Sequence, residues 1–355
     1  MKNIVSILSI LLAALSLTHA QDLDSYNSQA TISGYGELHY NYEKPDNGQG
    51  SAMLDFHRFV LFLGYNFNEQ WSLKSEIELE HNVVNDDRGD LQLEQAYINY
   101  HHSDFIGFQA GVLLVSAGLV NEFHEPQLFF GVERPEYHSR LIPTTWFGNG
   151  LGLYGNFHGF DYRFVLMEGL DADGFSESSA LRGGRQKGFK SDASNLLSNL
   201  KIGYTGILGL KLGASFTYNN AKGDSFSVPI NLIEFHAQYS ANNVNTAFEV
   251  GNISYDNYSI EKSFGYYFDF GYNIASFLNW QTQVIPFIRY SDINTAAKTA
   301  AGGISEKNNH ITQIMFGVSV KPLPNIVFKL DYGQKNLELN NRKTDLFNLG
   351  VGYSF

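Results

Sequence analysis

The sequence of 355 residues contains no cysteine. Disulfide bonds, thiolate nucleophiles and cysteine metal ligands are therefore excluded, and the fold must be held by its own packing. Proline is scarce, with 8 residues, and charged residues make up only 17% of the chain. Beyond the first twenty residues no run of eighteen apolar residues occurs, so the sequence predicts no membrane-spanning helix. The net charge of −12 argues against nucleic acid as a partner.

The first twenty residues have the pattern of a secretory signal peptide. Lys2 precedes an apolar run over 4–17, and Ala20 ends a small-residue cleavage site. This run is too short to span a bilayer. We therefore expect 1–20 to be a signal peptide and 21–355 to form one exported domain. A buried N-terminal helix is the alternative interpretation.

Aromatic residues and glycine are abundant, with 28 Phe, 21 Tyr and 34 Gly. The mean hydropathy is nevertheless slightly negative, at −0.20. This composition fits a sheet with one apolar and one polar face. Alternation with a period of two supports it, as in 264–270, where the sequence is Phe-Gly-Tyr-Tyr-Phe-Asp-Phe.

The alternating segments predict sixteen strands and no convincing amphipathic helix between them. Most of the strands are long enough to cross a bilayer at a tilt. The predicted strands are 30–42, 54–67, 70–82, 90–101, 105–116, 149–158, 160–170, 198–206, 209–219, 231–241, 244–255, 263–274, 280–291, 309–320, 325–336 and 343–355.

The predicted connections between strands alternate in length. Every second one is short, such as 68–69 and 242–243, and the others are longer, which is typical of a barrel with periplasmic turns and external loops. The last strand carries apolar residues at every second position and ends on Phe355. This pattern resembles the C-terminal signal by which the barrel-assembly machinery recognises outer-membrane barrels. The sequence therefore predicts an all-β, sixteen-stranded antiparallel barrel in the bacterial outer membrane.

The third of the longer connections, 117–148, is the longest. It contains three of the eight prolines and several apolar residues, so we expect an ordered loop that folds into the lumen and narrows it. The run from Gly111 to Trp146 resembles the phosphate-selective porin O/P-type family, in the form found in Bacteroidetes-like outer-membrane proteins. This resemblance implies a trimeric channel for small solutes, which in some members are anions.

The polar members of each alternation are expected to line the lumen. The inward residues are expected to be the basic Arg58, Lys74, Arg163, Lys211, Arg289 and Lys329, and the acidic Glu37, Glu76, Glu78, Glu80, Asp161, Glu234, Glu249, Asp269 and Asp331. Rings of one sign of charge select the opposite ion. Because acids outnumber bases here, the sequence favours a mildly cation-preferring lumen over the cationic ladder that phosphate selectivity needs. The alternative is that these charges only keep the lumen hydrated.

The charged residues of the long loop are the candidates for the constriction. They are Glu122, His124, Glu125, Glu133, Arg134, Glu136, His138 and Arg140. Acids facing bases across a narrow pore would set a transverse field and a size limit. Pairs such as Glu133 with Arg140 could instead tie the loop to the barrel wall. A His/Glu metal site is a further alternative, but the ligand spacing is irregular, so we predict no metal and no cofactor.

One basic cluster, 182–190, falls in a long connection. Its sequence context does not match a phosphate-binding loop, so we expect an external loop that contacts lipopolysaccharide phosphates or the mouth of the lumen, or is simply solvated. No Gly-x-Ser-x-Gly elbow is present, and the sequence predicts no enzyme. The predicted function is passive diffusion of small hydrophilic solutes or ions. A barrel-anchored surface binding protein and an outer-membrane hydrolase are the alternatives.

Overall fold

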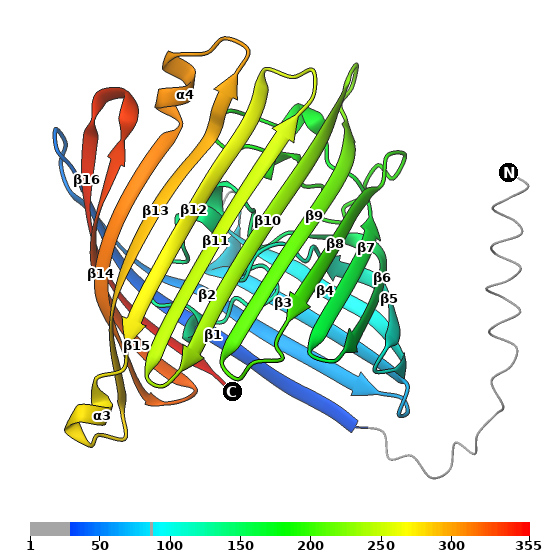
Figure 1. The fold of residues 1–355 in the computed structure, drawn as a ribbon, viewed down its shortest axis with the longest axis horizontal. Helices are drawn as coiled ribbons and strands as arrows, with labels where there is room; N and C mark the ends of the chain where they lie inside the picture. Colours follow the sequence, from blue (N-terminus) through cyan, green and yellow to red (C-terminus); the bar gives the residue numbers. More distant parts are fainter. Residues whose placement is uncertain (1–28, 86–87) are drawn as a thin grey trace, which may run out of the picture.

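The computed structural model describes residues 29–85 and 88–355. They form sixteen antiparallel strands that close into one barrel, in which each strand pairs with its neighbours in sequence and β1 pairs with β16 (Figure 1). The predicted fold class is confirmed. The predicted signal peptide, 1–20, lies outside the described residues. No helix in the described part of the chain is long and apolar enough to cross a bilayer.

Each predicted strand has its counterpart, and most ends differ by a few residues. The largest difference is in β13, expected at 280–291. The strands are β1 Gln29–Pro45, β2 Ser51–Asn66, β3 Trp71–Asn85, β4 Arg88–Ser103, β5 Ile106–Leu114, β6 Phe147–Phe157, β7 Phe160–Met167, β8 Leu197–Tyr204, β9 Leu210–Lys222, β10 Ser227–Ala241, β11 Val244–Tyr255, β12 Ile260–Tyr272, β13 Gln283–Thr299, β14 His310–Leu323, β15 Ile326–Leu337 and β16 Arg342–Ser354.

The described helices are single turns in the connections. They are η1 Pro126–Leu128, α2 Glu136–Arg140, η2 Ala172–Gly174, η3 Arg182–Gly184, α3 Ala275–Leu278, α4 Ile304–Asn308 and η4 Glu338–Asn340. Two of them, η1 and α2, belong to the connection between β5 and β6, which is 115–146. Two others, η2 and η3, belong to the connection between β7 and β8, which is 168–196.

The barrel closes at the last residue of the chain. Phe355 donates its amide to the carbonyl of Gly34 at 2.9 Å and accepts the amide of Gly34 at 3.0 Å. A side chain at Gly34 would meet the Phe355 ring and the carbonyl of Val60, so only glycine fits this close approach. The Phe355 ring also stacks near Phe59, with ring centroids 6.2 Å apart. The terminal aromatic residue therefore seals the seam of the barrel.

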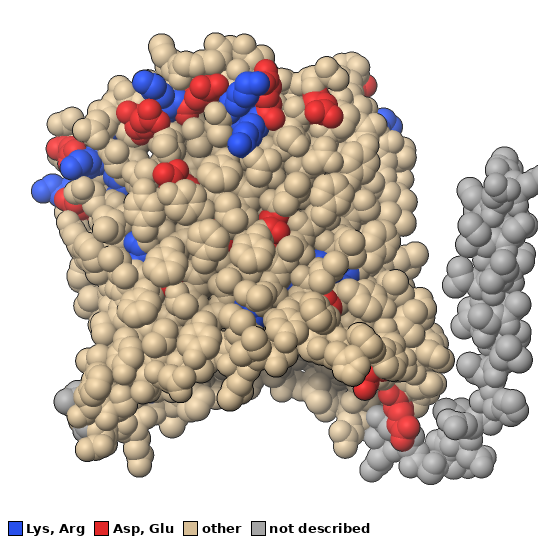
Figure 2. Space-filling view, in the orientation of Figure 1, with Lys and Arg blue, Asp and Glu red and all other residues tan. Residues whose placement is uncertain are grey.

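The outer face of the barrel is apolar. Along β12, Phe268 and Phe270 are exposed, whereas Tyr267 and Asp269, which alternate with them, are buried inside. Figure 2 shows the face formed by β8 to β13, where charged side chains gather at the edge of the longer connections and the middle is largely free of them. An uncharged band of this kind is what a lipid-facing surface requires.

The predicted sorting of connections by length is only partly correct. Several connections expected to be long are tight hairpins, as between β1 and β2 at 46–50 and between β9 and β10 at 223–226. On the other side, the β12–β13 connection at 273–282 is longer than expected and contains α3. Strands such as β1, β10 and β13 extend further than predicted, because hydrogen-bonded pairing continues past the apolar band, whereas β5 and β7 end earlier, where the two long connections begin. Only 115–146 and 168–196 are much longer than the rest.

The barrel interior is not uniformly polar, and the expectation of a polar lumen is wrong for one part of the wall. Inward positions of β10 and β11 such as Ile230, Leu232 and Ile253 are fully buried. They belong to one apolar cluster that also contains Leu141 from 115–146 and Leu181 from 168–196. Both long connections therefore fold into the barrel and fill part of it, because their apolar residues bury surface against these inward positions.

Two β-bulges change which residues face the interior. Opposite Leu38, the pairing of β1 with β2 jumps from Arg58 to Asp55, so β2 carries an extra residue there. Both Arg58 and His57 then contribute to the interior. A second bulge, between β3 and β4, has the same effect on β4 and turns Glu94 inward. A bulge reverses the alternation beyond it, so it adds polar groups that a simple period of two assigns to the outside.

Candidate functional site

The segment 115–146 lies inside the barrel and is held by hydrogen bonds to strands around the wall. The amide of Leu119 donates to Glu249 on β11 at 2.5 Å. The amide of Val132 donates to Asp331 on β15 at 2.7 Å. Because the acceptors are buried carboxylates on well-separated strands, the segment is fixed across the interior rather than along one side.

Glu122 is the centre of one anchor. Its carboxylate accepts hydrogen bonds from Arg163 of β7 at 2.9 Å, from Lys201 of β8 at 2.5 Å and from Ser116 at 2.8 Å. Burial alone would raise the pKa of Glu122, but the charges of Lys201 and Arg163 hold it at about 2. The carboxylate is therefore ionised at neutral pH and ties the start of the segment to two strands.

His124 makes a second anchor, on β3 and β4. Its Nε2 lies 3.0 Å from Glu76 and 3.6 Å from Glu94, and all three side chains are buried. Burial lowers the pKa of the His124 ring, but the Glu76 carboxylate outweighs it and the pKa is raised. Glu94 also accepts a hydrogen bond from the hydroxyl of Thr145, so residues near both ends of the segment contact β4.

The middle of the segment is held by β13 and β15. Arg289 donates two hydrogen bonds of 2.7 Å to Asp269 and a third, of 3.3 Å, to the carbonyl of Glu133. Lys329 donates to the carbonyl of Gly131 at 2.8 Å, and its ammonium lies 3.7 Å from the centre of the Phe129 ring. Both basic side chains are buried, and both donate hydrogen bonds to backbone carbonyls of the segment.

A fourth contact involves α2. His138 is fully buried and bonds Glu249 through Nε2, next to Tyr137 and Tyr267. Burial raises the pKa of Tyr137 well above its ordinary value. This buried bond between α2 and β11 stabilises the position of the segment.

The anchored segment leaves a cavity on each side. The larger one, of about 900 Å³, lies toward the end of the barrel that carries the longer connections. It is lined by residues of β1 to β4 and β13 to β16. The other, of about 360 Å³, lies toward the shorter turns, with Gln238 and Asn245 in its wall. Phe129 lines both cavities. The segment therefore divides the interior into two spaces, with Phe129 between them.

The large cavity has charges of both signs. Arg58 on its wall pairs with Glu37 at 3.0 Å and with Glu78 at 3.5 Å. Arg182 and Arg185, from the other long connection, donate to the backbone carbonyls of Thr144 and Thr145.

These two arginines differ from Arg58 in having no carboxylate partner. Within the described ranges neither Arg182 nor Arg185 lies at ion-pair distance from a carboxylate. Burial lowers the pKa of both guanidinium groups, that of Arg185 to about 10. The cavity therefore combines paired charges on the strands with two unpaired cations on a connection.

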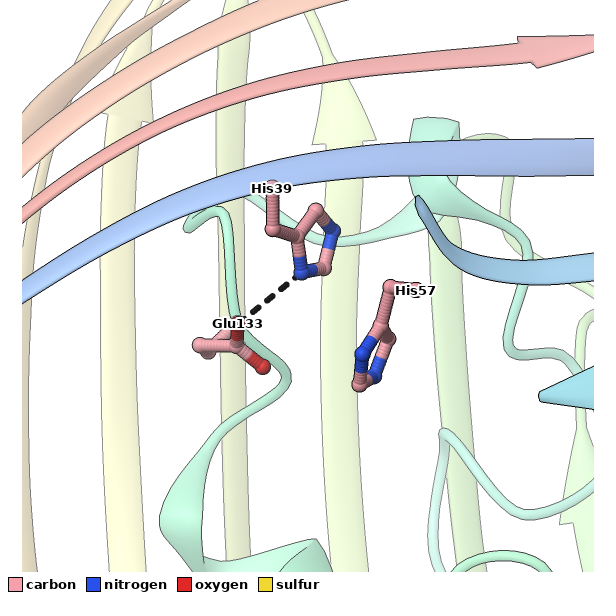
Figure 3. A group of neighbouring side chains, drawn as sticks. All are labelled: His39, His57 and Glu133. Atoms are coloured by element: carbon pink, nitrogen blue, oxygen red, sulfur yellow. Dashed lines mark hydrogen bonds and ion pairs between the residues drawn. The ribbon is translucent and has the colours of Figure 1, made fainter. Parts of the chain in front are cut away.

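Histidines gather at one wall of the large cavity. His39 of β1 and His57 of β2 stack with ring centroids 4.6 Å apart, and Nδ1 of His39 lies 2.9 Å from Glu133 of the segment (Figure 3). His81 of β3 adjoins His57 in an edge-on arrangement, at 5.6 Å. Asp55 contacts both of these rings, at 3.2 Å from His57 and 2.7 Å from His81.

The residues predicted from sequence fall into two groups. Those that line the large cavity are Arg58, Glu78, Glu133, Arg134 and Arg289, together with Glu37, Glu80, Glu136 and His138 from the wider sets of expected inward and loop residues. Those placed elsewhere are Lys74, Glu76, Glu122, His124, Glu125, Arg140, Arg163 and Lys329. Within the second group, Glu76, Glu122, His124, Arg163 and Lys329 anchor the inserted segment, as described above.

Three predicted residues have other surroundings. Lys74 is exposed on β3, and Arg140 pairs within α2 with Glu136 at 3.0 Å. Glu133 and Arg140, the example given for the alternative in which charge pairs tie the loop to the wall, do not pair with each other. Glu133 nevertheless ties the loop to β1, through His39 and Asn41. Glu125 has a buried carboxylate oxygen without a hydrogen-bond partner among the described residues.

The basic cluster at 182–190 was expected to lie in an external loop or at the mouth of the lumen, and part of it lies inside the barrel. Arg182 and Arg185 point into the barrel, whereas Lys187 is at the rim, 3.8 Å from Asp90. Of the alternatives, the position at the mouth of the lumen is the one observed. The reason is that 168–196 folds inward to bury Leu181 and Phe175.

Several important side chains do not appear among the sequence-predicted site residues. His39 lies two residues after Glu37, on the same face of the predicted strand, so the alternation that predicted Glu37 to face inward also applies to His39. His57 and Glu94 are turned inward by bulges, and Lys201 is identified only by its contact with Glu122, 79 residues away in sequence. No local pattern in the sequence signals the last three.

The fold is that of the bacterial outer-membrane porins. OmpF of Salmonella typhi superposes with a TM-score of 0.62 at 14% identity, over 92% of this chain and 97% of that one. An anion-selective porin from Comamonas acidovorans gives 0.60 at 12%, over 93% and 100%. OmpT of Vibrio cholerae, an outer membrane protein in a trimer form, gives 0.59 at 14%, over 93% and 100%. At these identities the likeness concerns the fold alone.

A relative in sequence narrows the assignment. A protein of Aquifex aeolicus (strain VF5), described as uncharacterized, is 30% identical over 350 residues, which is 92% of this chain and 80% of that protein. This chain belongs to the same family as that Aquifex protein. No protein-family model matches the chain.

Proposed function

We propose that the protein is a passive outer-membrane channel for small hydrophilic solutes and ions. The observation that carries this proposal is the anchored segment 115–146, which leaves a cavity on each side of Phe129. A segment fixed by buried charge pairs narrows a barrel without needing to move. Solutes would enter the large cavity, pass the segment near Phe129 and leave on the side of the shorter turns.

The ion preference that we propose is weak. The acidic excess predicted from sequence is mostly neutralised, because Glu37, Glu76 and Asp269 each pair with a basic or histidine side chain. Arg182 and Arg185 add positive charge to the same cavity. They would accept small anions such as phosphate, which is the solute class implied by the resemblance to the phosphate-selective family. A lumen of mixed charge passes both signs of ion, with at most a mild preference for cations.

The proposed surroundings follow from the fold class. The exposed aromatic and aliphatic outer face would contact outer-membrane lipid, and lysines at the rim such as Lys187 and Lys190 would contact lipopolysaccharide phosphates. The terminal strand ending at Phe355 would be read by the barrel-assembly machinery. A homotrimer is proposed from the resemblance, and one structural neighbour has a trimer form.

Planar-bilayer recording of the refolded full-length protein tests these proposals together. We expect discrete current steps, grouped in threes if trimers insert. Under a salt gradient of potassium chloride, the reversal potential should indicate a permeability ratio of cation to anion within a few-fold of unity.

A strong anion preference would contradict the mixed-charge account while leaving the channel intact. Absence of steps from protein shown to be folded by circular dichroism would contradict the channel itself. That second result would favour a barrel that anchors a surface binding protein.

A further inference from the structure

Three separate parts of the chain bring metal-ligand side chains to one place on the wall of the large cavity. His39 comes from β1, His57 from the bulge of β2, and Glu133 from the inserted segment. One donor atom from each lies within 4.8 Å of the other two. Ligands of a tetrahedral ion with bonds of ~2.0–2.1 Å lie roughly 3.4 Å apart. Small side-chain rotations would therefore let all three donors reach one ion.

Carboxylates behind the rings fix their orientation. Nε2 of His39 lies 3.2 Å from Glu37, which leaves Nδ1 directed at Glu133. His57 presents Nδ1 to Asp55, at 3.2 Å. Metal-binding histidines commonly bond a carboxylate through the nitrogen that does not bind the metal, because this fixes the ring and makes it a stronger ligand. Both histidines here have that support.

The local charge suits a cation. The carboxylates of Glu37, Asp55 and Glu133 contact the two rings, whereas the guanidinium of the neighbouring Arg58 is shared between Glu37 and Glu78. The site is also accessible, since His39, His57 and Glu133 line the large cavity and the Glu133 side chain is 42% exposed. An ion could therefore reach it from the interior water.

We propose that His39, His57 and Glu133 form a binding site for a divalent transition-metal ion such as zinc or nickel. Two imidazoles and one carboxylate favour these ions over magnesium or calcium, which prefer sites built from oxygen ligands alone. His81 and Asp55 form a second group that shares His57, and would supply a ligand to an ion displaced toward the rim. Binding at this site does not require the barrel to conduct.

Two other groups of metal-ligand side chains are weaker candidates. Glu76 of β3, Glu94 of β4 and His124 of the inserted segment form one buried group, and Glu234, His236 and Glu249 form another on β10 and β11. Of these six residues, Glu94 is the one that lines the large cavity. All three side chains are buried in each of these groups, so the more accessible group of His39, His57 and Glu133 carries the proposal.

Equilibrium binding of nickel and zinc to the untagged, refolded full-length barrel in detergent tests the site. Isothermal titration should show saturable binding, unaffected by a large excess of magnesium. The variants H57Q and E133Q should each weaken it by at least about tenfold, since even supporting residues of metal sites change affinity by 10–100-fold. The matched control is H101Q, because His101 lies at the end of β4 near Asp104, with 44% of its side chain exposed, and outside this group.

The result that overturns the proposal is equal affinity in wild type, H57Q and E133Q, or no saturable binding in the wild type. Circular dichroism and resistance of the barrel to heating in detergent identify any variant that fails to fold, and E133Q provides an independent test should H57Q do so. Recording current from the same preparations separates the two proposals. Metal binding without conductance leaves the site standing and removes the channel, and conductance without metal binding does the reverse.

Discussion

Removing the inserted segment should raise the single-channel conductance several-fold. In the native barrel, 115–146 and the buried pairs that hold it occupy much of the interior cross-section. Without it the two cavities on either side of Phe129 would merge. Glu76 and Asp331 of the wall, which now bond the segment, would lose these partners. They would then face water, so no charge would be left buried without a partner.

The structure suggests where to make the excision. The amide of Val115 bonds the carbonyl of Trp146 at 2.9 Å, directly after the pair of Leu114 with Phe147. A two-residue Asn-Gly turn fits between strands at such a pair. The variant would therefore join Val115 to Trp146 through Asn-Gly in place of 116–145.

Single-channel recording of this variant beside the wild type gives the result. The control is a variant with the 301–307 part of the β13–β14 connection shortened in the same way, which should conduct like the wild type because that connection is not among the residues lining either cavity. Unchanged conductance after excision of 116–145 would refute the constriction role, provided that circular dichroism shows an intact barrel.

The second large effect is expected from Arg289. Replacing Arg289 by Met leaves the Asp269 carboxylate buried without its two hydrogen bonds, and breaks the contact with the backbone of Glu133. Removing one partner of a buried ion pair typically costs about 3–5 kcal/mol. We expect a loss of this size in the free energy of unfolding, measured by denaturant titration in lipid vesicles.

Two further variants test the cause. The double variant R289M/D269N should recover much of the lost stability, because no charge is then left buried without a partner. Lys298→Met should have no measurable effect, since Lys298 pairs with Glu261 on the surface and both side chains are exposed. If R289M were as stable as the wild type, the pair would not anchor the inserted segment as described.

The strands of the barrel wall could be predicted from sequence because each one is signalled by the pattern of its own neighbouring residues. Each strand shows its own period of two, and the closing strand ends on Phe355, which bonds Gly34. What local alternation does not show is where a bulge interrupts it. The extra residue in β2 brings His57 beside Arg58 in the interior, and nothing in the letters around it signals the change.

The candidate site was less predictable because its contacts join distant parts of the chain. Glu249 receives the amide of Leu119 from 130 residues away, and Lys329 bonds a carbonyl 198 residues away. The loop residues Glu122 and His124 were expected to face the pore, but they turn to the wall because buried partners there stabilise their charges. The apolar inward positions of β10 become intelligible only once the two connections that cover them are placed.

The central claim is that small hydrophilic solutes cross this barrel passively, past a fixed constriction. Liposome swelling measures it most directly. Vesicles containing the refolded wild-type protein, diluted into iso-osmotic sugars of increasing size, should swell rapidly with the smallest sugar and progressively more slowly with larger ones. Swelling no faster than in protein-free vesicles, for every sugar, would contradict the claim.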